Sequence, residues 1–284
     1  MFTNLYGFFG NKGPVWKTQT ANPAQSAYLG ASGVYNNATA FGGNYWNGGF
    51  LTTTYTFNGS SWTGGGSMIT PTWNMAYCGN STQSSSISGG SNATNYINNN
   101  EVYGSGSWSN YPSVITARKA FASAGTVGST TLSFGGYNGG SALTNVEVLS
   151  GSWSNTTGLN VAVDSNMGCG TGTATLCIGG YGISAVVLTN QSWSGSTWTT
   201  GASLNAPIYG GAACGTQSSA LAFGGNSGSG YVIMAQLWNG TTWGNSSPLN
   251  YPRSGLAGCG TSTKAISIGG FPATSNYGVT EVYS

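Results

Sequence analysis

The sequence predicts an all-β fold, a six-bladed β-propeller made of four-stranded antiparallel blades, because two features recur together six times. One is a Gly-Gly pair that ends a small or apolar run, and the other is a tryptophan. Both repeat at intervals of about 45 residues, a spacing typical of propeller blades rich in short strands. The first glycines of the six pairs are Gly42, Gly89, Gly135, Gly179, Gly224 and Gly269. The tryptophans are Trp16, Trp62, Trp108, Trp153, Trp198 and Trp243.

The fifth repeat shows how one blade divides into four strands, named a to d along the chain. We expect strand a at 209–216 and strand b at 219–223, followed by strand c at 231–238 and strand d around Thr242 and Trp243. The links contain Asn-Gly and Gly-Thr-Gln, which favour turns. Strand a is rich in Gly, Ala and Cys, as expected where thin inner strands of neighbouring blades pack together. The tryptophan of strand d is expected to cover the apolar gap between blades.

The two ends of the sequence predict how the ring closes. The last repeat stops at Ser284 after three strands, whereas Trp16 precedes any strand a. The segment 14–17 is therefore expected to supply strand d of the last blade, which leaves no open sheet edge. The chain then divides into an N-terminal apolar arm, residues 1–13, and one propeller domain, residues 14–284.

The composition excludes several classes of partner. Only 4% of the residues are charged, against about 25% in ordinary soluble domains. A net charge of +2 leaves no basic patch for phosphate groups, so we expect no nucleic-acid partner. No apolar run approaches the roughly 18 residues of a membrane span, and the first residues lack the basic start of a signal peptide. We therefore expect no membrane insertion.

The five cysteines predict buried thiols. Four of them, Cys78, Cys169, Cys214 and Cys259, share one repeat position, where the third blade has Ala124. A position that accepts Cys or Ala is a slot for a small buried side chain. Equivalent positions on separate blades seldom approach closely enough for a disulfide. No Cys/His cluster is present, so we expect neither a metal nor another cofactor.

The sequence offers little for catalysis. It has no histidine, which excludes Ser-His-Asp and Cys-His nucleophilic sites. Glu101, Glu147 and Glu281 occupy one strand c position in different blades, so we expect backbone groups to satisfy them. Asp164 stands alone near the start of a strand a, as in a turn or cap. No phosphate-binding glycine loop is present, and we predict no enzyme activity.

These motifs together resemble the kelch repeat over nearly the whole chain. Kelch blades have an apolar strand ending in Gly-Gly, a Glu-aromatic strand and then a tryptophan. The kelch arginine that opens strand a is present only as Arg118 and Arg253. The copper chemistry of the kelch-type enzyme galactose oxidase needs histidine ligands, which this chain lacks. The strand c motifs are Glu101-Val-Tyr103, Glu147-Val-Leu149 and Glu281-Val-Tyr283, with Tyr55, Gln191 and Gln236 replacing Glu elsewhere.

Aromatic residues mark the face formed by the b–c and d–a loops. Exposed aromatic rings beside asparagines suit sugar binding or a protein interface. The alternative is that these rings pack locally and cap the blades. The b–c candidates are Tyr45, Trp46, Tyr96, Tyr137, Tyr181, Tyr231, Phe271 and Tyr277. The d–a candidates are Trp73, Tyr111 and Tyr251.

The N-terminal arm is the second candidate binding element. Phe2, Leu5, Tyr6, Phe8 and Phe9 precede the closing strand and belong to no blade. Each would cost on the order of 1.5–3 kcal/mol if left in water. The arm is expected either to fold back on its own propeller or to dock into a neighbouring subunit.

These features favour a non-catalytic structural protein of an assembly. The low charge and the Gly, Ser, Thr and Asn content resemble kelch-like structural proteins of tailed phages. That resemblance implies a virion component, assembled in the host cytoplasm, that decorates the capsid or tail or takes part in fibre-associated adhesion. Its partners would be other virion proteins and, on the aromatic face, host-surface glycans. The alternatives are a lectin-like glycan-binding protein at a cell surface and, with less support, an intracellular kelch adaptor.

Overall fold

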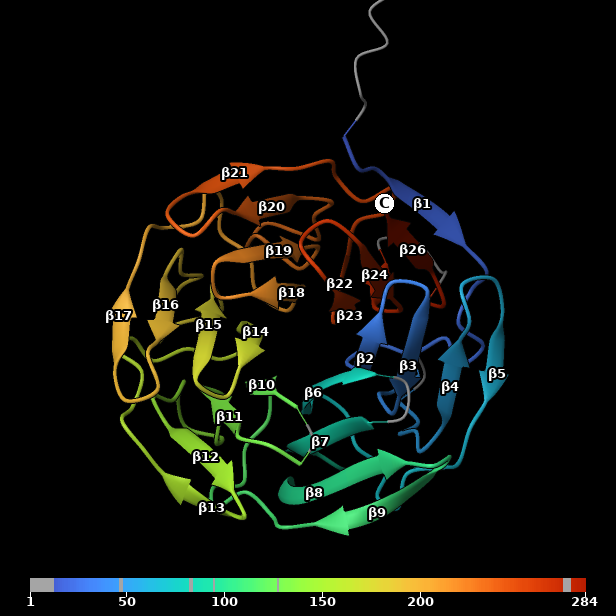
Figure 1. The fold of residues 1–284 in the computed structure, drawn as a ribbon, viewed down its shortest axis with the longest axis horizontal. Helices are drawn as coiled ribbons and strands as arrows, with labels where there is room; N and C mark the ends of the chain where they lie inside the picture. The colour runs from blue at the N-terminus through green and yellow to red at the C-terminus, as the bar shows by residue number, and fades with distance from the viewer. Residues whose placement is uncertain (1–12, 46–47, 82–83, 94, 127, 273–276) are drawn as a thin grey trace, which may run out of the picture.

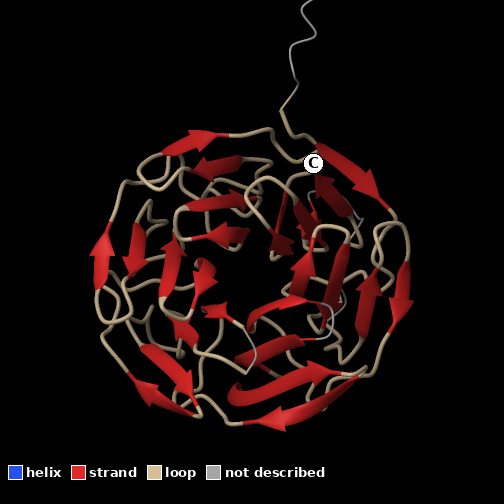
Figure 2. Cartoon of the chain, viewed as in Figure 1, coloured by secondary structure: helices blue, strands red, loops and turns tan. Residues whose placement is uncertain are grey.

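The computed structural model confirms a six-bladed propeller with four antiparallel strands in each blade (Figure 1). It describes residues 13–284 except 46–47, 82–83, 94, 127 and 273–276. All regular structure within these residues is β-strand (Figure 2). Residues 1–12 of the predicted arm lie outside the described residues, with all five of its apolar side chains.

In each blade the first strand lies beside the propeller axis and the fourth lies at the outer rim (Figure 1). Blade 1 contains β2 (Gly30–Val34), β3 (Asn37–Phe41), β4 (Thr54–Phe57) and β5 (Trp62–Gly64). Blade 2 contains β6 (Ala76–Ser81), β7 (Ser84–Ser91), β8 (Tyr96–Gly104) and β9 (Ser107–Tyr111). Blade 3 contains β10 (Ala122–Gly125), β11 (Thr131–Phe134), β12 (Val146–Ser150) and β13 (Ser152–Asn155).

The remaining blades repeat this order until the ring closes. Blade 4 contains β14 (Met167–Thr171), β15 (Ala174–Ile178), β16 (Asn190–Trp193) and β17 (Trp198–Thr200). Blade 5 contains β18 (Ala212–Thr216), β19 (Ser219–Phe223), β20 (Ala235–Trp238) and β21 (Trp243–Asn245). Blade 6 contains β23 (Ala257–Gly260), β24 (Ala265–Ile268), β26 (Thr280–Tyr283) and β1 (Trp16–Gln19). A short pair, β22 (Arg253–Ser254) and β25 (Phe271–Pro272), precedes and follows its inner strands.

The N-terminal strand closes the ring as predicted. β1 pairs antiparallel with β26, and Trp16 lies opposite Tyr283. In blade 5, strand b has the predicted bounds, but strands a and c begin three and four residues later than predicted. The reason is local: Gly210 and the Gly-Gly pair have positive φ angles that bend the chain and interrupt the ladders.

A ring of six backbone hydrogen bonds surrounds the propeller axis. In every blade the residue two positions before the inner strand has φ between +50° and +67°, and its N–H donates to the equivalent carbonyl of the preceding blade. The N···O distances are 2.6–2.9 Å, and the bond from Tyr28 to Gly255 closes the circle. Four members are not glycine, and a left-handed conformation costs each of them on the order of 1–2 kcal/mol. The ring members are Tyr28, Asn74, Ala120, Ser165, Gly210 and Gly255.

The Gly-Gly pairs form a second set of bonds between blades, in the opposite direction. The N–H of each second glycine donates to a carbonyl two residues before the ring member of the next blade, at 2.8–3.0 Å. Gly180, for example, donates to the Ile208 carbonyl with φ +111°. A Cβ on Gly180 would lie 2.7 Å from the Asp164 carbonyl oxygen. The motif therefore reflects close backbone approach as well as turn geometry. The donors and acceptors are Gly43 and Thr72, Gly90 and Arg118, Gly136 and Val163, Gly180 and Ile208, Gly225 and Arg253, and Gly270 and Ser26.

The outer tryptophans cover the gaps between blades, as predicted. Phe223 at the end of β19 meets Trp16 of the next blade, with ring centroids 4.8 Å apart. The same contact joins Phe134 to Trp198 at 5.4 Å. Five of the six repeat tryptophans are buried and Trp62 is half-buried, so each interface between blades is apolar at its outer edge.

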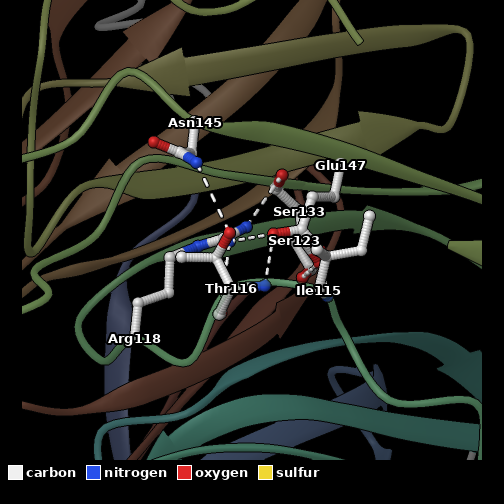
Figure 3. Close-up of polar contacts among 7 residues, drawn as sticks. All are labelled: Ile115, Thr116, Arg118, Ser123, Ser133, Asn145 and Glu147. Atoms are coloured by element: carbon white, nitrogen blue, oxygen red, sulfur yellow. Dashed lines mark hydrogen bonds and ion pairs between the residues drawn. The ribbon is translucent and has the colours of Figure 1, made fainter. Parts of the chain in front are cut away.

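Buried charge in strand c is matched to the residue that faces it. Glu147 accepts hydrogen bonds from the backbone N–H groups of Ile115 and Thr116 and forms an ion pair with buried Arg118 (Figure 3). Arg253 and Glu281 repeat this ion pair in blade 6, at 3.0 Å.

Four blades lack the arginine, and two of them use a neutral glutamine as the acceptor. Val163 and Ile208 replace the arginine in blades 4 and 5, where Gln191 and Gln236 replace the glutamate and accept the same backbone bonds. Blade 2 keeps Glu101 without an arginine, and its two oxygens accept N–H groups at 2.8 and 2.9 Å. The expectation that backbone groups satisfy these glutamates is therefore confirmed.

All five cysteines are free and buried. Burial raises the pKa of Cys78, Cys169 and Cys177 to about 12. Each thiol therefore stays protonated at neutral pH, and its sulfur is shielded from solvent.

Replacing Gly180 with alanine should destabilise the fold by about 1–3 kcal/mol, because the new Cβ meets a carbonyl and the φ angle is strained. Urea unfolding of G180A and of the parent chain measures the difference in their free energies of unfolding. Gly64 is the matched control, since nothing lies within 4 Å of a Cβ placed there. Equal free energies of unfolding for G180A and G64A would contradict a steric requirement for glycine at position 180.

Removing Arg118 alone should cost about 3–5 kcal/mol, because R118V leaves the Glu147 carboxylate buried without its cation. Adding E147Q should recover much of this loss, because R118V/E147Q reproduces the Val and Gln pair of blade 4. Equilibrium unfolding in urea compares the variants. A double variant no more stable than R118V would show that charge matching does not explain the pattern.

Ellman's reagent should modify none of the five thiols in the folded protein at pH 8, because raised pKa values and burial remove the reactive thiolate. All five should react once guanidinium unfolds the chain. Absorbance at fixed times, with and without denaturant, measures the number of thiols that react in the unfolded and in the folded chain. A native thiol that reacts as fast as free cysteine would contradict the burial.

Candidate functional site

The b–c and d–a connections meet on one side of the propeller, here called the loop face. In each blade the residue after the Gly-Gly pair bridges antiparallel to the residue before the ring member. These paired positions bring twelve side chains around the hydrogen-bonded ring. The pairs are Ala27 and Asn44, Trp73 and Ser91, Lys119 and Tyr137, Asp164 and Tyr181, Tyr209 and Asn226, and Ser254 and Phe271.

Blades 2 and 3 hold a lysine between aromatic rings, a group called here the lysine cage. The Nζ of Lys119 lies 5.2 Å from the ring centroids of Trp73 and Tyr96 and 6.0 Å from that of Tyr137. Within the described residues Lys119 forms no ion pair. Each ring face contributes roughly 0.5–1 kcal/mol at an exposed site. The rings therefore take the place of a carboxylate for this ammonium group.

A pocket of about 440 Å³ opens beside the lysine cage. Its lining combines aromatic faces with amide groups from the b–c connection of blade 2. Asn92 also organises this loop, since its Oδ1 accepts the N–H of Asn95. The lining residues are Phe50, Trp73, Ser91, Asn92, Ala93, Asn95 and Tyr96.

Blades 4 and 5 gather tyrosines around Asp164, a group called here the tyrosine cluster. The rings of Tyr181 and Tyr209 meet edge to face with centroids 5.6 Å apart. Burial raises the pKa of Tyr209, and the nearby Tyr181, Tyr231 and Asp164 raise it further. Burial also raises the pKa of Asp164, partly offset by a 2.8 Å bond from the Ser165 hydroxyl and by the charge of Lys119. The cluster comprises Tyr181, Tyr209, Tyr231 and Asp164, and Tyr28 of blade 1 lies near Tyr209 and Tyr231.

The axis below the loop face is divided by one side chain. The Tyr77 hydroxyl reaches from β6 to β23, where it accepts the N–H of Gly258 at 3.3 Å. Tyr77 lines both a cavity of about 80 Å³ next to the ring and one of about 300 Å³ toward the opposite face. Burial raises the pKa of Tyr77, so its hydroxyl stays protonated at neutral pH.

Seven of the predicted aromatic residues lie in contact with one another or in the two groups above. Tyr277 packs on Phe271, Phe271 on Tyr28 and Tyr28 on Trp73, with centroids 5.2–5.7 Å apart. These contacts show local packing, which was the alternative to a binding role, and the binding role of these rings stays a prediction. The seven are Trp73, Tyr96, Tyr137, Tyr181, Tyr231, Phe271 and Tyr277.

Other predicted site residues lie elsewhere. Tyr111 ends β9 and packs, half-buried, against a buried cluster of Val114, Leu149 and Trp153, apart from the two groups above. The reason is that the outer strand turns its ring into the interface between blades. Tyr45 and Tyr251 are exposed, without ring contacts among the described residues. Trp46, Phe2, Leu5, Tyr6, Phe8 and Phe9 lie outside the described residues.

Sequence reasoning missed five members of the site: Tyr28, Phe50, Lys119, Asp164 and Tyr209. Four of them occupy the ring position or the one before it, at a constant offset from the repeat motifs. Aligning the six repeats on these motifs would have placed Trp73, Lys119, Asp164 and Tyr209 at equivalent positions. Phe50 carries no such signal, because it follows a b–c loop of irregular length.

The described residues contain no group of three or more His, Cys, Asp or Glu side chains that could hold a metal ion. They also contain no helix long and apolar enough to cross a membrane.

Comparison with known proteins places the chain by fold. No protein-family model matches it, and no curated protein matches it. It is similar to the solved structure titled "Structure of YjhT", with a TM-score of 0.75 and 13% sequence identity over 94% of this chain and 95% of that chain. At this identity the likeness shows the six-bladed propeller fold alone.

Proposed function

We propose that this protein is a non-catalytic interaction module that binds its partner through the loop face. The observation that carries the proposal is the gathering of aromatic rings from separate blades on that face. Tyr181 and Tyr231 remain 36% and 41% exposed there. Tyrosine and tryptophan supply much of the binding energy where they cluster at protein interfaces.

The partner class we favour is another protein of a large assembly, the virion of a tailed phage. With 4% charged residues, little repulsion opposes contact between this surface and a neighbouring subunit. The composition, rich in Gly, Ser, Thr and Asn, resembles that of phage structural proteins. The chain would then decorate the capsid or tail.

A second candidate function is glycan binding, favoured by the pocket beside the lysine cage. Trp73 and Phe50 offer apolar faces of the kind that stack on sugar rings, and Asn92 and Asn95 offer amide groups nearby. This reading places the protein at a cell surface, with sugar affinity in the isolated chain.

The test compares the free protein with particles purified from the source culture. Mass spectrometry should find the chain in particles at fixed stoichiometry. Hydroxyl-radical footprinting should show several-fold lower oxidation of Tyr181 and Tyr231 in particles than in free protein. Tyr35, in the turn between β2 and β3 on the opposite face, is the internal control and should change little.

Two results would contradict this proposal. Absence of the chain from particles, with binding to cells or to a glycan array, would favour the second candidate. Protection of Tyr35 without protection of Tyr181 and Tyr231 would place the interface on the opposite face.

A further inference from the structure

The lysine cage shows that this face can hold an alkylammonium group between ring faces. Lys119 carries the ammonium, and its backbone bridges to Tyr137 through two hydrogen bonds of 2.9 and 3.1 Å. Trp73 and Tyr96 complete the cage.

One blade further on, the same backbone positions carry the opposite charge. Asp164 takes the place of Lys119 and bridges to Tyr181 through hydrogen bonds of 2.7 and 2.8 Å. Tyr181 thus takes the place of Tyr137, and Tyr209 supplies a further ring at 5.6 Å. The tyrosine cluster therefore places a carboxylate beside aromatic rings, at the position that holds the ammonium in the lysine cage.

The Asp164 carboxylate has no cation of its own among the described residues. The two ion pairs found there join Arg118 to Glu147 and Arg253 to Glu281. Asp164 accepts one hydrogen bond, from the Ser165 hydroxyl. Lys119 acts on it only electrostatically, because the rings of the lysine cage hold that ammonium group more than 4 Å away. An external cation would compensate this half-buried charge.

The surroundings of the cluster indicate a protein as the source of the cation. Ile183, Leu188 and Ile233 belong to the b–c connections of the same two blades and are 84%, 39% and 40% exposed. A small free amine would leave these apolar side chains in water. A protein surface that presents a lysine would cover them.

We propose that the tyrosine cluster binds the side-chain ammonium of a lysine on the protein partner, with Asp164 as its hydrogen-bond acceptor. The proposal rests on the proposed function, since it names the group that the loop face recognises. Ring faces attract the cation, and the carboxylate adds a charge-assisted hydrogen bond. The exposed rings of Tyr181 and Tyr231 leave the cluster open to solvent.

The test uses Nα-acetyl-lysine methylamide as the probe and Nα-acetyl-norleucine methylamide as its uncharged match. Titration into protein with ¹³C-labelled tyrosines should shift the ring signals of Tyr181, Tyr209 and Tyr231 with the lysine probe only. D164N should weaken binding by on the order of tenfold, because it removes the charge of the hydrogen-bond acceptor. Y231A should weaken it as well, whereas Y251A removes an exposed tyrosine outside the cluster and should not.

The pH dependence gives an independent readout. Affinity should fall as acidification protonates Asp164, while the probe ammonium stays charged throughout. In D164N this dependence should disappear. Equal binding of the norleucine probe, or absence of tyrosine shifts with the lysine probe, would overturn the proposal. Footprinting of assembled particles reports separately on whether the loop face is an interface at all.

Discussion

Six backbone hydrogen bonds around the axis hold the blades in one closed circle, and other features of the molecule depend on that closure. Each bond joins residues about 45 positions apart or, at the seam, 227 positions apart, from Tyr28 to Gly255. The cost of the four left-handed residues that are not glycine is tolerated because every ring member is both donor and acceptor, so no single residue can relax without breaking two bonds. The Gly-Gly bonds run the opposite way between blades, which fixes the angle of each blade against the next.

Charge in the interior follows from the same close packing. A carboxylate in strand c costs little where backbone N–H groups and an arginine surround it, as at Glu147 and Glu281. Where Val163 and Ile208 fill the arginine position, an amide keeps the backbone bonds without bringing a charge into an apolar site. Glu101 in blade 2 accepts two backbone N–H groups and has Thr72 in place of the arginine.

The chemistry of the loop face depends on side chains that the propeller scaffold does not constrain. The residue before each ring member has its backbone fixed by a bridge, but its side chain can differ from blade to blade. Lys119 and Asp164 occupy this position in adjacent blades and give two aromatic groups of opposite charge. A rigid ring that presents variable side chains at fixed spacing is suited to recognition, because little entropy is lost when a partner binds.

The sequence by itself determined the number of blades, the order of their strands and the closure by Trp16, because these depend on repeated glycines and tryptophans that only one geometry accommodates. It also indicated most of the aromatic residues of the loop face. Only the tertiary structure decided which of these rings meet, since Tyr28, Trp73 and Phe271 come from different blades and touch only once the ring has closed. It also packed Tyr111 against the cluster between two blades and placed the Tyr77 hydroxyl within hydrogen-bond distance of β23. A local pattern specifies strands and turns, whereas contacts between blades depend on the curvature that all six blades produce together.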